Sequence, residues 1–94
     1  MISRLIKMEA LRFVKEEKLK TLADINDGYC ADFALEICHK IKGAKFVKGP
    51  GHCWIAYDGK LYDAEHPRGV SNPLRLNFYK RDWRERRNLR RVLR

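Results

Sequence analysis

The sequence predicts an α+β fold in which a helix carrying a cysteine packs on a small antiparallel sheet, flanked by N- and C-terminal helices. Two observations carry this prediction: apolar residues recur with helical spacing after Cys30, and a hairpin pattern centres on Asp58-Gly59. The chain has 94 residues, 45% of them hydrophobic, which suits one small core and argues against disorder. We therefore expect residues 1–94 to form a single domain.

The first predicted element is a helix over residues 3–23. No Gly or Pro interrupts this stretch, and its apolar residues, Ile6 and Phe13 among them, form one broad face. Oppositely charged residues four positions apart, such as Glu16 and Lys20, are typical of the solvated side of a helix.

A second helix is predicted over residues 29–42, with Asp27 as its N-cap and Gly43 past its end. Its apolar positions are Phe33, Ala34, Ile37, Cys38 and Ile41. With this cap, Cys30 falls in the first turn, where unpaired N–H groups and a partial positive charge favour a thiolate. The Asp32 side chain should point away from the Cys30 thiol, because residues two apart on a helix do not face each other.

Two strands and a tight turn are predicted next. Residues 44–48 form a short strand, and Gly49-Pro50-Gly51 turns the chain into a hairpin over residues 52–65. Within this hairpin, Asp58-Gly59 is a strong signal for a two-residue type I′ turn, which fixes the pairing register.

The register places the side chains of His52, Trp54, Asp63 and Glu65 on one face of the sheet. Asp63 is then the diagonal neighbour of His52, at about 7–8 Å between backbones, which allows an imidazole–carboxylate hydrogen bond. Glu65, directly opposite His52, competes with Asp63 as the orienting acid. Side-chain reach favours Asp63.

The remaining residues are predicted to form a loop, a strand and a helix. Residues 66–73 form the loop, and residues 74–79 form the final short strand. Residues 80–94 form a basic helix whose apolar positions are Trp83, Leu89, Val92 and Leu93.

These positions suggest a thiol nucleophile with a base and an orienting carboxylate. Cys30 as thiolate would be the nucleophile, His52 would hold the ion pair and later protonate a leaving amine, and Asp63 would fix the imidazole tautomer. Cys38 and Cys53 are expected in the core, since free cysteine is among the most buried residue types.

Two stretches resemble the transglutaminase-like superfamily. Residues 28–34, Gly-Tyr-Cys-Ala-Asp-Phe-Ala, resemble the Gly-x-Cys-x-Asp-Tyr/Phe-Ala helix of that superfamily. Residues 51–64 are similar to its second block, a His-x-Trp strand followed by Asp-Gly-Lys and Tyr-Asp. The two motifs stand in the family's order and spacing and together cover residues 28–65.

The resemblance implies a minimal single-domain member with a circularly permuted-looking papain-type core. It also implies a triad of Cys30, His52 and Asp63 that acts through a thioester on an amide of a peptide or protein, as a peptidase, amidase, deamidase or acyl transferase. Hydrolysis is favoured over cross-linking, because so small a fold has little wall to keep water from a thioester. The alternative is a non-catalytic binding module on the same scaffold.

The oxyanion hole is less well marked than the triad. Papain-like enzymes often place a Gln or Trp upstream of the cysteine, and residues 1–27 contain neither. The Cys30 N–H is therefore the first expected donor. Further substrate-binding or oxyanion candidates are Tyr29, Trp54 and Glu65.

The charge of the chain is concentrated at its C-terminal end. The net charge is +9, and residues 75–94 carry nine Lys or Arg against Asp82 and Glu85, hence +7. A basic helix of this kind favours contact with nucleic acid or with an acidic protein partner. The residues expected to make such contacts are Arg84, Arg86, Arg87, Arg90, Arg91 and Arg94.

Composition limits the other classes of function. The cysteine and histidine residues show no C-x-x-C or H-x-x-x-H spacing, so we expect neither a metal site nor a cofactor. Three cysteines form an odd set, unlike a secreted disulfide framework, and the early charges argue against a signal peptide. No apolar run is long enough to span a membrane, so a cytoplasmic protein is expected.

Overall fold

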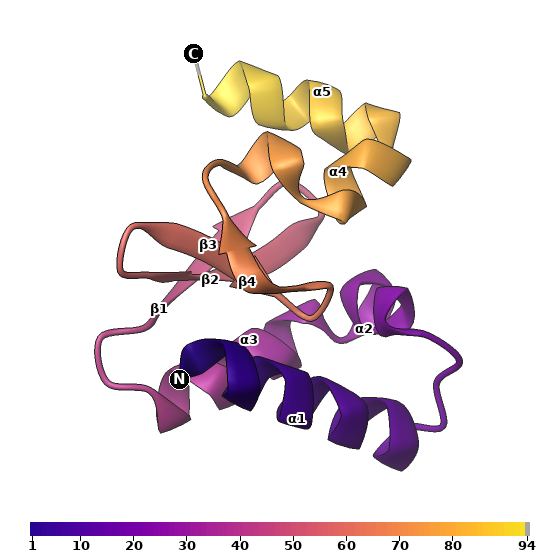
Figure 1. Ribbon diagram of the computed structural model, residues 1–94. Coiled ribbons are helices and arrows are strands. Elements are labelled where there is room, and N and C mark those ends of the chain that lie inside the picture. Colours follow the sequence, from indigo (N-terminus) through magenta and orange to yellow (C-terminus); the bar gives the residue numbers. More distant parts are fainter. Residues whose placement is uncertain (94) are drawn as a thin grey trace.

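The computed structural model describes residues 1–93 and is an α+β domain built around a four-stranded antiparallel sheet. Consecutive strands pair with one another: β1 (Lys45–Gly49), β2 (His52–Tyr57), β3 (Lys60–Asp63) and β4 (His66–Val70). One face of the sheet carries α1 (Ile2–Glu16), α2 (Leu22–Gly28) and α3 (Cys30–Lys40). The other face carries the 3-10 turn η1 (Pro73–Arg75), α4 (Asn77–Arg81) and α5 (Trp83–Val92) (Figure 1).

The hairpin follows its predicted register. Tyr57 lies opposite Lys60, and Ile55 lies opposite Tyr62. Both turn residues have the positive φ that a type I′ turn requires, 49° at Asp58 and 79° at Gly59. Because this turn fixes the pairing, His52 and Asp63 lie on the same face of the sheet, as predicted.

The single helix predicted over residues 3–23 is wrong, since this segment forms α1 and the start of α2. The chain leaves α1 at Glu17, and Lys18 adopts a left-handed conformation with φ of 55°. A new helix begins after Thr21, where the carboxylate of Asp24 accepts the Thr21 N–H at 3.0 Å. Asp27 therefore lies inside α2 and is not the N-cap of α3; Tyr29 holds that position.

The predictions for residues 66–79 are also wrong. The expected loop contains β4, in which Val70 pairs with Leu61; an edge strand tolerates Pro67, the residue that suggested a loop. The expected final strand is η1 and α4 instead. A side chain accepts a backbone N–H in the first turn of each helix. Asn72 accepts the Leu74 N–H in η1 at 3.0 Å, and His66 Nε2 accepts the Asn77 N–H in α4 at 2.9 Å.

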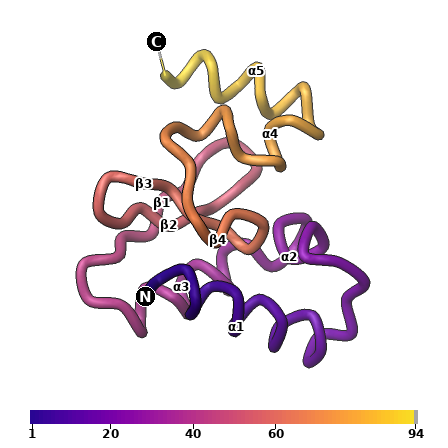
Figure 2. The backbone as a smooth tube through the Cα atoms, in the orientation of Figure 1, coloured from indigo at the N-terminus to yellow at the C-terminus, as the bar shows by residue number. Residues whose placement is uncertain are grey.

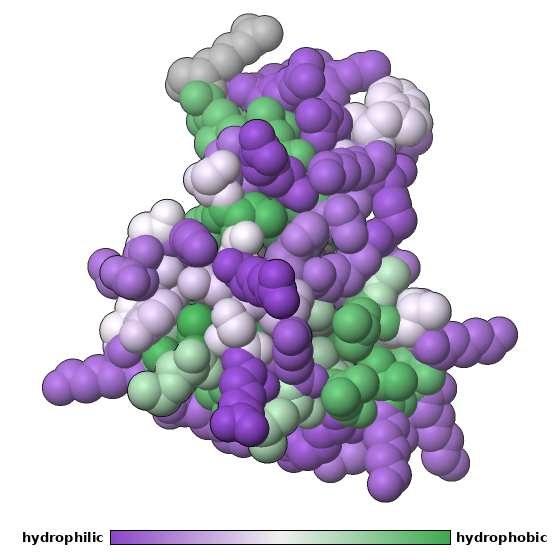
Figure 3. Space-filling view, in the orientation of Figure 1, coloured by the Kyte–Doolittle hydropathy of each residue, from purple (hydrophilic) through white to green (hydrophobic). Residues whose placement is uncertain are grey.

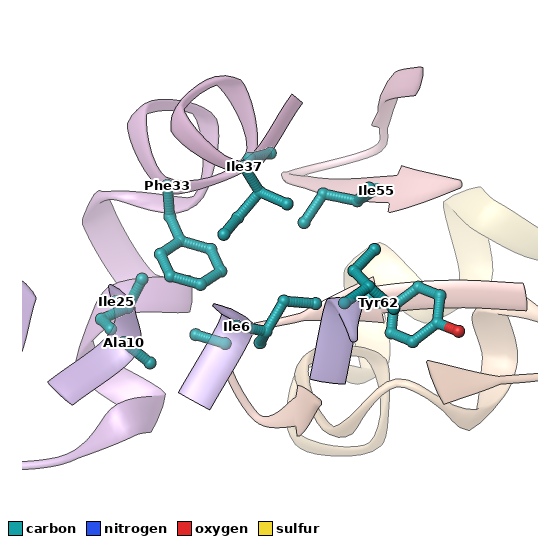
Figure 4. Close-up of a cluster of buried hydrophobic side chains, with 10 residues drawn as sticks. Ile6, Ala10, Ile25, Phe33, Ile37, Ile55 and Tyr62 are labelled. Carbon is teal, nitrogen blue, oxygen red and sulfur yellow. The ribbon is translucent and has the colours of Figure 1, made fainter. Parts of the chain in front are cut away.

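The first hydrophobic cluster lies between α1–α3 and the sheet. Figure 4 shows its aliphatic and aromatic side chains converging from the helices and from β2 and β3. Its fully buried members include Ile6, Ile25, Phe33, Ile37 and Ile55, each at most 1% exposed. This cluster fixes α3, and with it Cys30, on the sheet.

The second hydrophobic cluster lies on the opposite face and is smaller and more aromatic. It joins β2 to the C-terminal helices, which the tube in Figure 2 shows above the sheet. Its buried members are Trp54, Leu76, Phe78, Tyr79 and Leu89. The basic helix α5 is therefore anchored by Leu89 rather than free of the domain.

No helix within residues 1–93 combines the length and the apolar character that crossing a membrane requires.

Candidate active site

Cys30 is the first residue of α3 and is partly exposed. The first backbone N–H groups of a helix have no partner within it, and they place a partial positive charge at this end. Asp32, in the same turn, is exposed to solvent. The start of α3 thus presents the Cys30 thiol in an electropositive setting without an inward-facing carboxylate.

His52 opens β2 and is buried beneath the surface of the site, with its side chain fully enclosed. Its ring stacks on Phe78 with centroids 4.6 Å apart and an interplanar angle of 15°. The edge of Tyr79 packs against the same ring at 6.0 Å. These aromatic contacts from α4 hold the imidazole plane in one orientation.

Asp63 ends β3 and makes the hydrogen bond that the sequence predicted, from His52 Nε2 to Asp63 Oδ2 at 2.9 Å. The backbone N–H of Glu65 donates to the other carboxylate oxygen at 3.0 Å, and the Asn26 side-chain amide donates to Oδ2 at 3.3 Å. With both oxygens so occupied, Asp63 has one orientation, and it directs Nε2 of the imidazole toward itself.

The other ring nitrogen, Nδ1, is not engaged by Asp63. Within residues 1–93 this buried atom has no hydrogen-bond partner at standard geometry. Hydrogen bonding to His52 is nevertheless the main reason that the pKa of Cys30 lies below its ordinary value; burial opposes that shift. The geometry therefore pairs the carboxylate with Nε2, and the lowered pKa of Cys30 shows the influence of His52 on the thiol.

The pKa of His52 responds in the opposite direction. Burial is the largest single influence and would lower the pKa, but the hydrogen bonds and charges of Asp63 and Cys30 together outweigh burial and raise it. A lowered thiol pKa and a raised imidazole pKa both favour the thiolate–imidazolium form over the neutral pair.

Cys53 also lowers the pKa of Cys30, an influence that the sequence did not reveal. It acts through its backbone N–H and its thiol. Burial, together with the neighbouring Cys30 charge, raises the pKa of Cys53 itself to about 11. The alternation of side chains along β2 places Cys53 and His52 on opposite faces of the sheet. It does not predict that Cys53 affects Cys30, which belongs to α3.

Glu65 is not an alternative orienting acid. Its carboxylate forms a two-point ion pair with Arg81, 2.9 Å at each oxygen, and accepts the Asn26 amide at 2.8 Å. Asn26 thereby bridges the carboxylates of Glu65 and Asp63. No local sequence pattern links Asn26 in α2 or Arg81 in α4 to a hairpin residue.

Tyr29 and Trp54, two of the predicted substrate-binding or oxyanion candidates, make packing contacts in the structure. The Tyr29 ring packs edge-on against Phe13, with centroids 6.5 Å apart, at the margin of the first cluster. Trp54 is only 4% exposed, in the second cluster. Both rings contribute to packing.

A cleft of about 600 Å³ lies beside the buried imidazole. One of its walls is Phe78, which stacks on His52, and another is Asp27, three residues before Cys30. The remaining lining residues come from the junction of α4 and α5: Arg81, Asp82, Trp83, Arg84 and Glu85. Neither Cys30 nor His52 lines this cleft, which adjoins the imidazole through Phe78.

The arginines of α5 do not all share one environment. Arg86 donates to the Leu74 carbonyl at 3.0 Å, and Arg87 lies over the exposed Trp83 ring at 4.9 Å. The exposed members of the predicted set are Arg84, Arg87, Arg90 and Arg91, and Arg94 lies outside the described residues. In Figure 3 the upper part of the molecule, where α5 lies, is largely hydrophilic.

The side chains give no sign of a metal centre in the part of the chain that the structure describes. Residues 1–93 contain no group of three or more His, Cys, Asp or Glu side chains placed to hold an ion. Cys38, beside His39 on α3, is partly buried, and burial raises its pKa.

Comparison of the chain with protein-family models, with curated proteins and with solved structures gave no match. The geometry around Cys30, His52 and Asp63 is therefore the basis on which a function is proposed.

Proposed function

We propose that the protein is a transglutaminase-like cysteine hydrolase that cleaves or transfers at an amide through a thioester on Cys30. One observation carries the proposal: Asp63 holds Nε2 of His52 at 2.9 Å, while Nδ1 is left for a thiol at a helix N-terminus. A base oriented by a third group is the general arrangement for activating a nucleophile. The packing of the Cys30 helix on an antiparallel sheet agrees with the papain-type core that the sequence motifs imply.

In the proposed reaction the Cys30 thiolate attacks the carbonyl carbon of the substrate amide. As the tetrahedral intermediate collapses, the C–N bond breaks and the proton on His52 Nδ1 passes to the leaving amine. The acyl group remains on sulfur as a thioester. His52 then accepts a proton from water, whose oxygen attacks the thioester and releases the acid and the Cys30 thiolate.

The backbone N–H of Cys30 is the oxyanion donor we propose. It stands at the first helical position, where it has no intrahelical partner, and the positive end of the α3 dipole adds to its effect. The packed position of the Tyr29 ring favours this backbone donor over the Tyr29 hydroxyl. Water reaches a partly exposed Cys30 readily, which favours hydrolysis over transfer.

The pH dependence of alkylation at Cys30 tests the thiolate–imidazolium pair. The protein is treated with iodoacetamide, and the modified peptides are quantified by mass spectrometry in wild type and in His52→Ala. Wild-type Cys30 should react rapidly below its ordinary titration range of about pH 8.5, and the midpoint should move upward in His52→Ala. Equal midpoints in the two proteins would remove the basis of the proposal.

The cysteines act as internal controls in this measurement. Cys53 is 7% exposed and its raised pKa keeps it protonated, so it should remain unmodified while Cys30 reacts. Cys38 should titrate above the ordinary thiol range, because burial raises its pKa. Cys53 is best left in place, since its replacement would remove a thiol that helps to lower the pKa of Cys30.

Polyanion binding by α5 is a second candidate function, favoured by one specific observation. The exposed Trp83 ring is stacked with Arg87, and this pair offers an aromatic face beside exposed guanidinium groups. Base stacking on aromatic rings and arginine contacts to phosphate are the two components of sequence-tolerant single-strand binding.

The salt dependence of oligonucleotide binding distinguishes binding by α5 from attraction to the overall positive charge of the protein. Binding of a single-stranded oligonucleotide is measured by fluorescence anisotropy at several salt concentrations, for the triple variant Arg87→Gln, Arg90→Gln, Arg91→Gln. The matched control removes the same charge from exposed residues of α1: Arg4→Gln, Lys7→Gln, Lys15→Gln. A reduced salt slope in the first variant alone would support binding by α5, and equal slopes would oppose it.

A further inference from the structure

An apolar groove of about 490 Å³ lies between the first strand of the sheet and the last helix. Its lining residues are Val47, Lys48, Gly49, Pro50, Trp54, Pro73, Leu89, Val92 and Leu93, of which Lys48 alone is charged. Val92 is 69% exposed and Leu93 is 50% exposed, so the groove opens to solvent on the α5 side. In Figure 3 an apolar area interrupts the hydrophilic surface in the part of the molecule where α5 lies.

The outer edge of β1 is open beside this groove. β1 pairs with β2 alone, so no strand among residues 1–93 adjoins its other edge. Gly49 and His52 flank a two-residue turn and are therefore a hydrogen-bonded pair, and such pairs alternate with non-hydrogen-bonded pairs along antiparallel strands. The N–H and C=O groups of Phe46 and Lys48 consequently point away from β2, toward the open edge.

The opposite edge of the sheet is protected in a way that β1 is not. β4 contains Pro67, which lacks a backbone N–H, and α1 packs against this strand. β1 contains no proline, and its pairing with β2 runs without a bulge from Lys45 to Gly49. A regular open edge beside an apolar groove is the arrangement that binds an extended peptide by adding it to the sheet.

We propose that the β1 edge and the adjoining groove bind an extended segment of a partner protein in which acidic and apolar residues alternate. The segment adds a further strand to the sheet beside β1. Its apolar side chains enter the groove, and its acidic side chains lie on the opposite face of the sheet, beside the Lys48 side chain. The inference uses none of Cys30, His52 and Asp63, so it does not depend on amide hydrolysis.

Strand alternation sorts the two kinds of side chain. Val47 lies opposite Trp54 and packs on the second cluster, so its side chain is on the groove side of the sheet. Lys48, which borders the groove, lies opposite Cys53 and has its side chain on the other face. In an added strand, every second side chain would point toward the groove, and the side chains between them would lie beside Lys48.

Charge favours an acidic segment over a second copy of this chain. Lys45 and Lys48 are exposed on β1, and Arg90 is exposed on α5. Neither β1 nor residues 88–93 contain an acidic residue. Antiparallel pairing of two β1 strands would bring the two lysines of each strand together, in molecules that each carry a net charge of +9. An acidic strand would place opposite charges across the pair instead.

Binding of two synthetic peptides of identical composition and charge tests the inference. One alternates, Glu-Val-Glu-Leu-Glu-Val-Glu, and in the other, Glu-Glu-Val-Leu-Val-Glu-Glu, both faces of an extended strand mix acidic and apolar side chains. Each carries a fluorophore, and binding to the full chain is measured by fluorescence anisotropy. We expect the alternating peptide to bind more tightly by about tenfold, because all its apolar side chains enter the groove together. Equal binding of the two peptides, or binding of neither, would overturn the inference.

Amide hydrogen exchange, resolved by NMR, locates the bound strand. In the free protein the amides of Phe46 and Lys48 should exchange quickly, whereas the Val47 amide, which faces β2, should exchange slowly. The alternating peptide should slow the exchange of Phe46 and Lys48 and leave Val47 unchanged. Protection that arises elsewhere and not at Phe46 and Lys48 would contradict the proposed site.

Two matched variants separate the groove from the rest of the surface. Val92→Glu places a negative charge on the groove wall at an exposed position, and it should weaken binding of the alternating peptide by about tenfold. Met8→Glu changes the net charge equally at a residue of α1 that is 60% exposed, and it should bind like wild type. Equal losses in both variants would show that charge alone governs binding and would overturn the inference.

Sedimentation of the protein alone tests the competing occupant. Lys48→Pro removes an outward N–H while the bonds from β1 to β2 remain, as an edge strand permits. We expect the wild-type chain to sediment as a monomer and Lys48→Pro to bind the alternating peptide weakly. A wild-type dimer that is lost in Lys48→Pro would assign the edge to a second copy and overturn the inference.

Discussion

The two faces of the sheet are built from different chemistry. The face covered by α1–α3 is closed with aliphatic side chains such as Ile6, Ile25 and Ile37, all fully buried. The face covered by α4 and α5 is aromatic, and it encloses polar atoms without partners among residues 1–93, His52 Nδ1 and Trp54 Nε1. Unpaired buried polar atoms reduce stability. The comparison indicates that the first face supplies the aliphatic core, whereas the second encloses the His52 imidazole among aromatic rings.

The candidate site lies where these two faces meet. Cys30 comes from a helix of the first face, whereas Phe78 and Tyr79, which pack on His52, belong to the second. A substitution in the first face should therefore reduce stability more than it reduces the reactivity of Cys30. A substitution in the second face should reduce the reactivity of Cys30 more than it reduces stability.

The largest expected effect is on the first face. Phe33→Ala should lower the free energy of unfolding by about 3–5 kcal/mol, because the ring is 1% exposed and its removal leaves a cavity. Urea denaturation of the purified variant measures this loss. Leu35→Ala is the matched control on the same helix, since Leu35 is 46% exposed and should change stability by about 0.5 kcal/mol or less. Similar losses in both variants would contradict a closed first cluster.

Asp63→Asn tests the second face with little change of shape. The new side-chain amide would place an NH₂ donor against one of the two donors that now bind the Asp63 carboxylate, the Asn26 amide or the Glu65 N–H. The substitution would also remove the negative charge that raises the pKa of His52. We expect the rate of Cys30 alkylation below pH 7 to fall by roughly tenfold or more, with a folded far-UV spectrum. Asp58→Asn in the turn of the same hairpin is the control and should react like wild type, since Asp58 is exposed.

The hairpin and the His52–Asp63 pair were predictable because local rules decide them. Asp58-Gly59 selects one turn type, that turn selects one register, and the register fixes which side chains share a face. The boundaries of α1 and α2 were not predictable in the same way, because an amphipathic pattern continues across the point where Lys18 turns the chain. Tertiary packing and the Thr21 capping box decide that break.

The rest of the site depends on contacts between distant segments. The Asn26 side chain donates to Asp63, 37 positions away in the chain, and Cys53 lowers the pKa of the distant Cys30. No periodicity or motif encodes such pairs in a single sequence. Residues 74–79 form helical turns rather than the predicted strand for a similar reason. The Asn77 N–H at the start of α4 donates to the side chain of His66, which lies 11 positions earlier in the chain.

A moderate effect is expected at Phe78. Phe78→Leu keeps an apolar side chain but removes the stacked ring, so stability should fall by about 1 kcal/mol while the alkylation rate of Cys30 falls further than stability alone explains. Thermal unfolding and peptide-resolved alkylation measure the two quantities. Leu76→Met, in the same cluster but without a ring against His52, is the comparison. A parallel loss of reactivity in both variants would show that the cluster acts only through general packing.

The smallest expected effect lies at the rim, where Arg81 pairs with Glu65. Burial alone would raise the pKa of Glu65, but the hydrogen bonds from Arg81 and Asn26 outweigh it and hold the pKa below its ordinary value. A lowered carboxyl pKa stabilises the folded state above the unfolded value of about 4.3 and loses that contribution as the pH falls through the folded value. Arg81 is 41% exposed, so Arg81→Gln should cost only about 1 kcal/mol near neutral pH.

The sign of this pH dependence distinguishes the ion pair from a packing effect. The difference in unfolding free energy between wild type and Arg81→Gln should be largest near neutral pH and should shrink below about pH 4, as Glu65 becomes protonated in both states. Urea denaturation across that range measures it. A difference that stays constant down to pH of about 2 would mean that the Arg81 side chain contributes through its contacts alone. Glu65 also binds Asn26, which donates to Asp63. An alkylation rate of Cys30 that is nearly unchanged in Arg81→Gln would therefore show that Asn26 keeps its position without the ion pair.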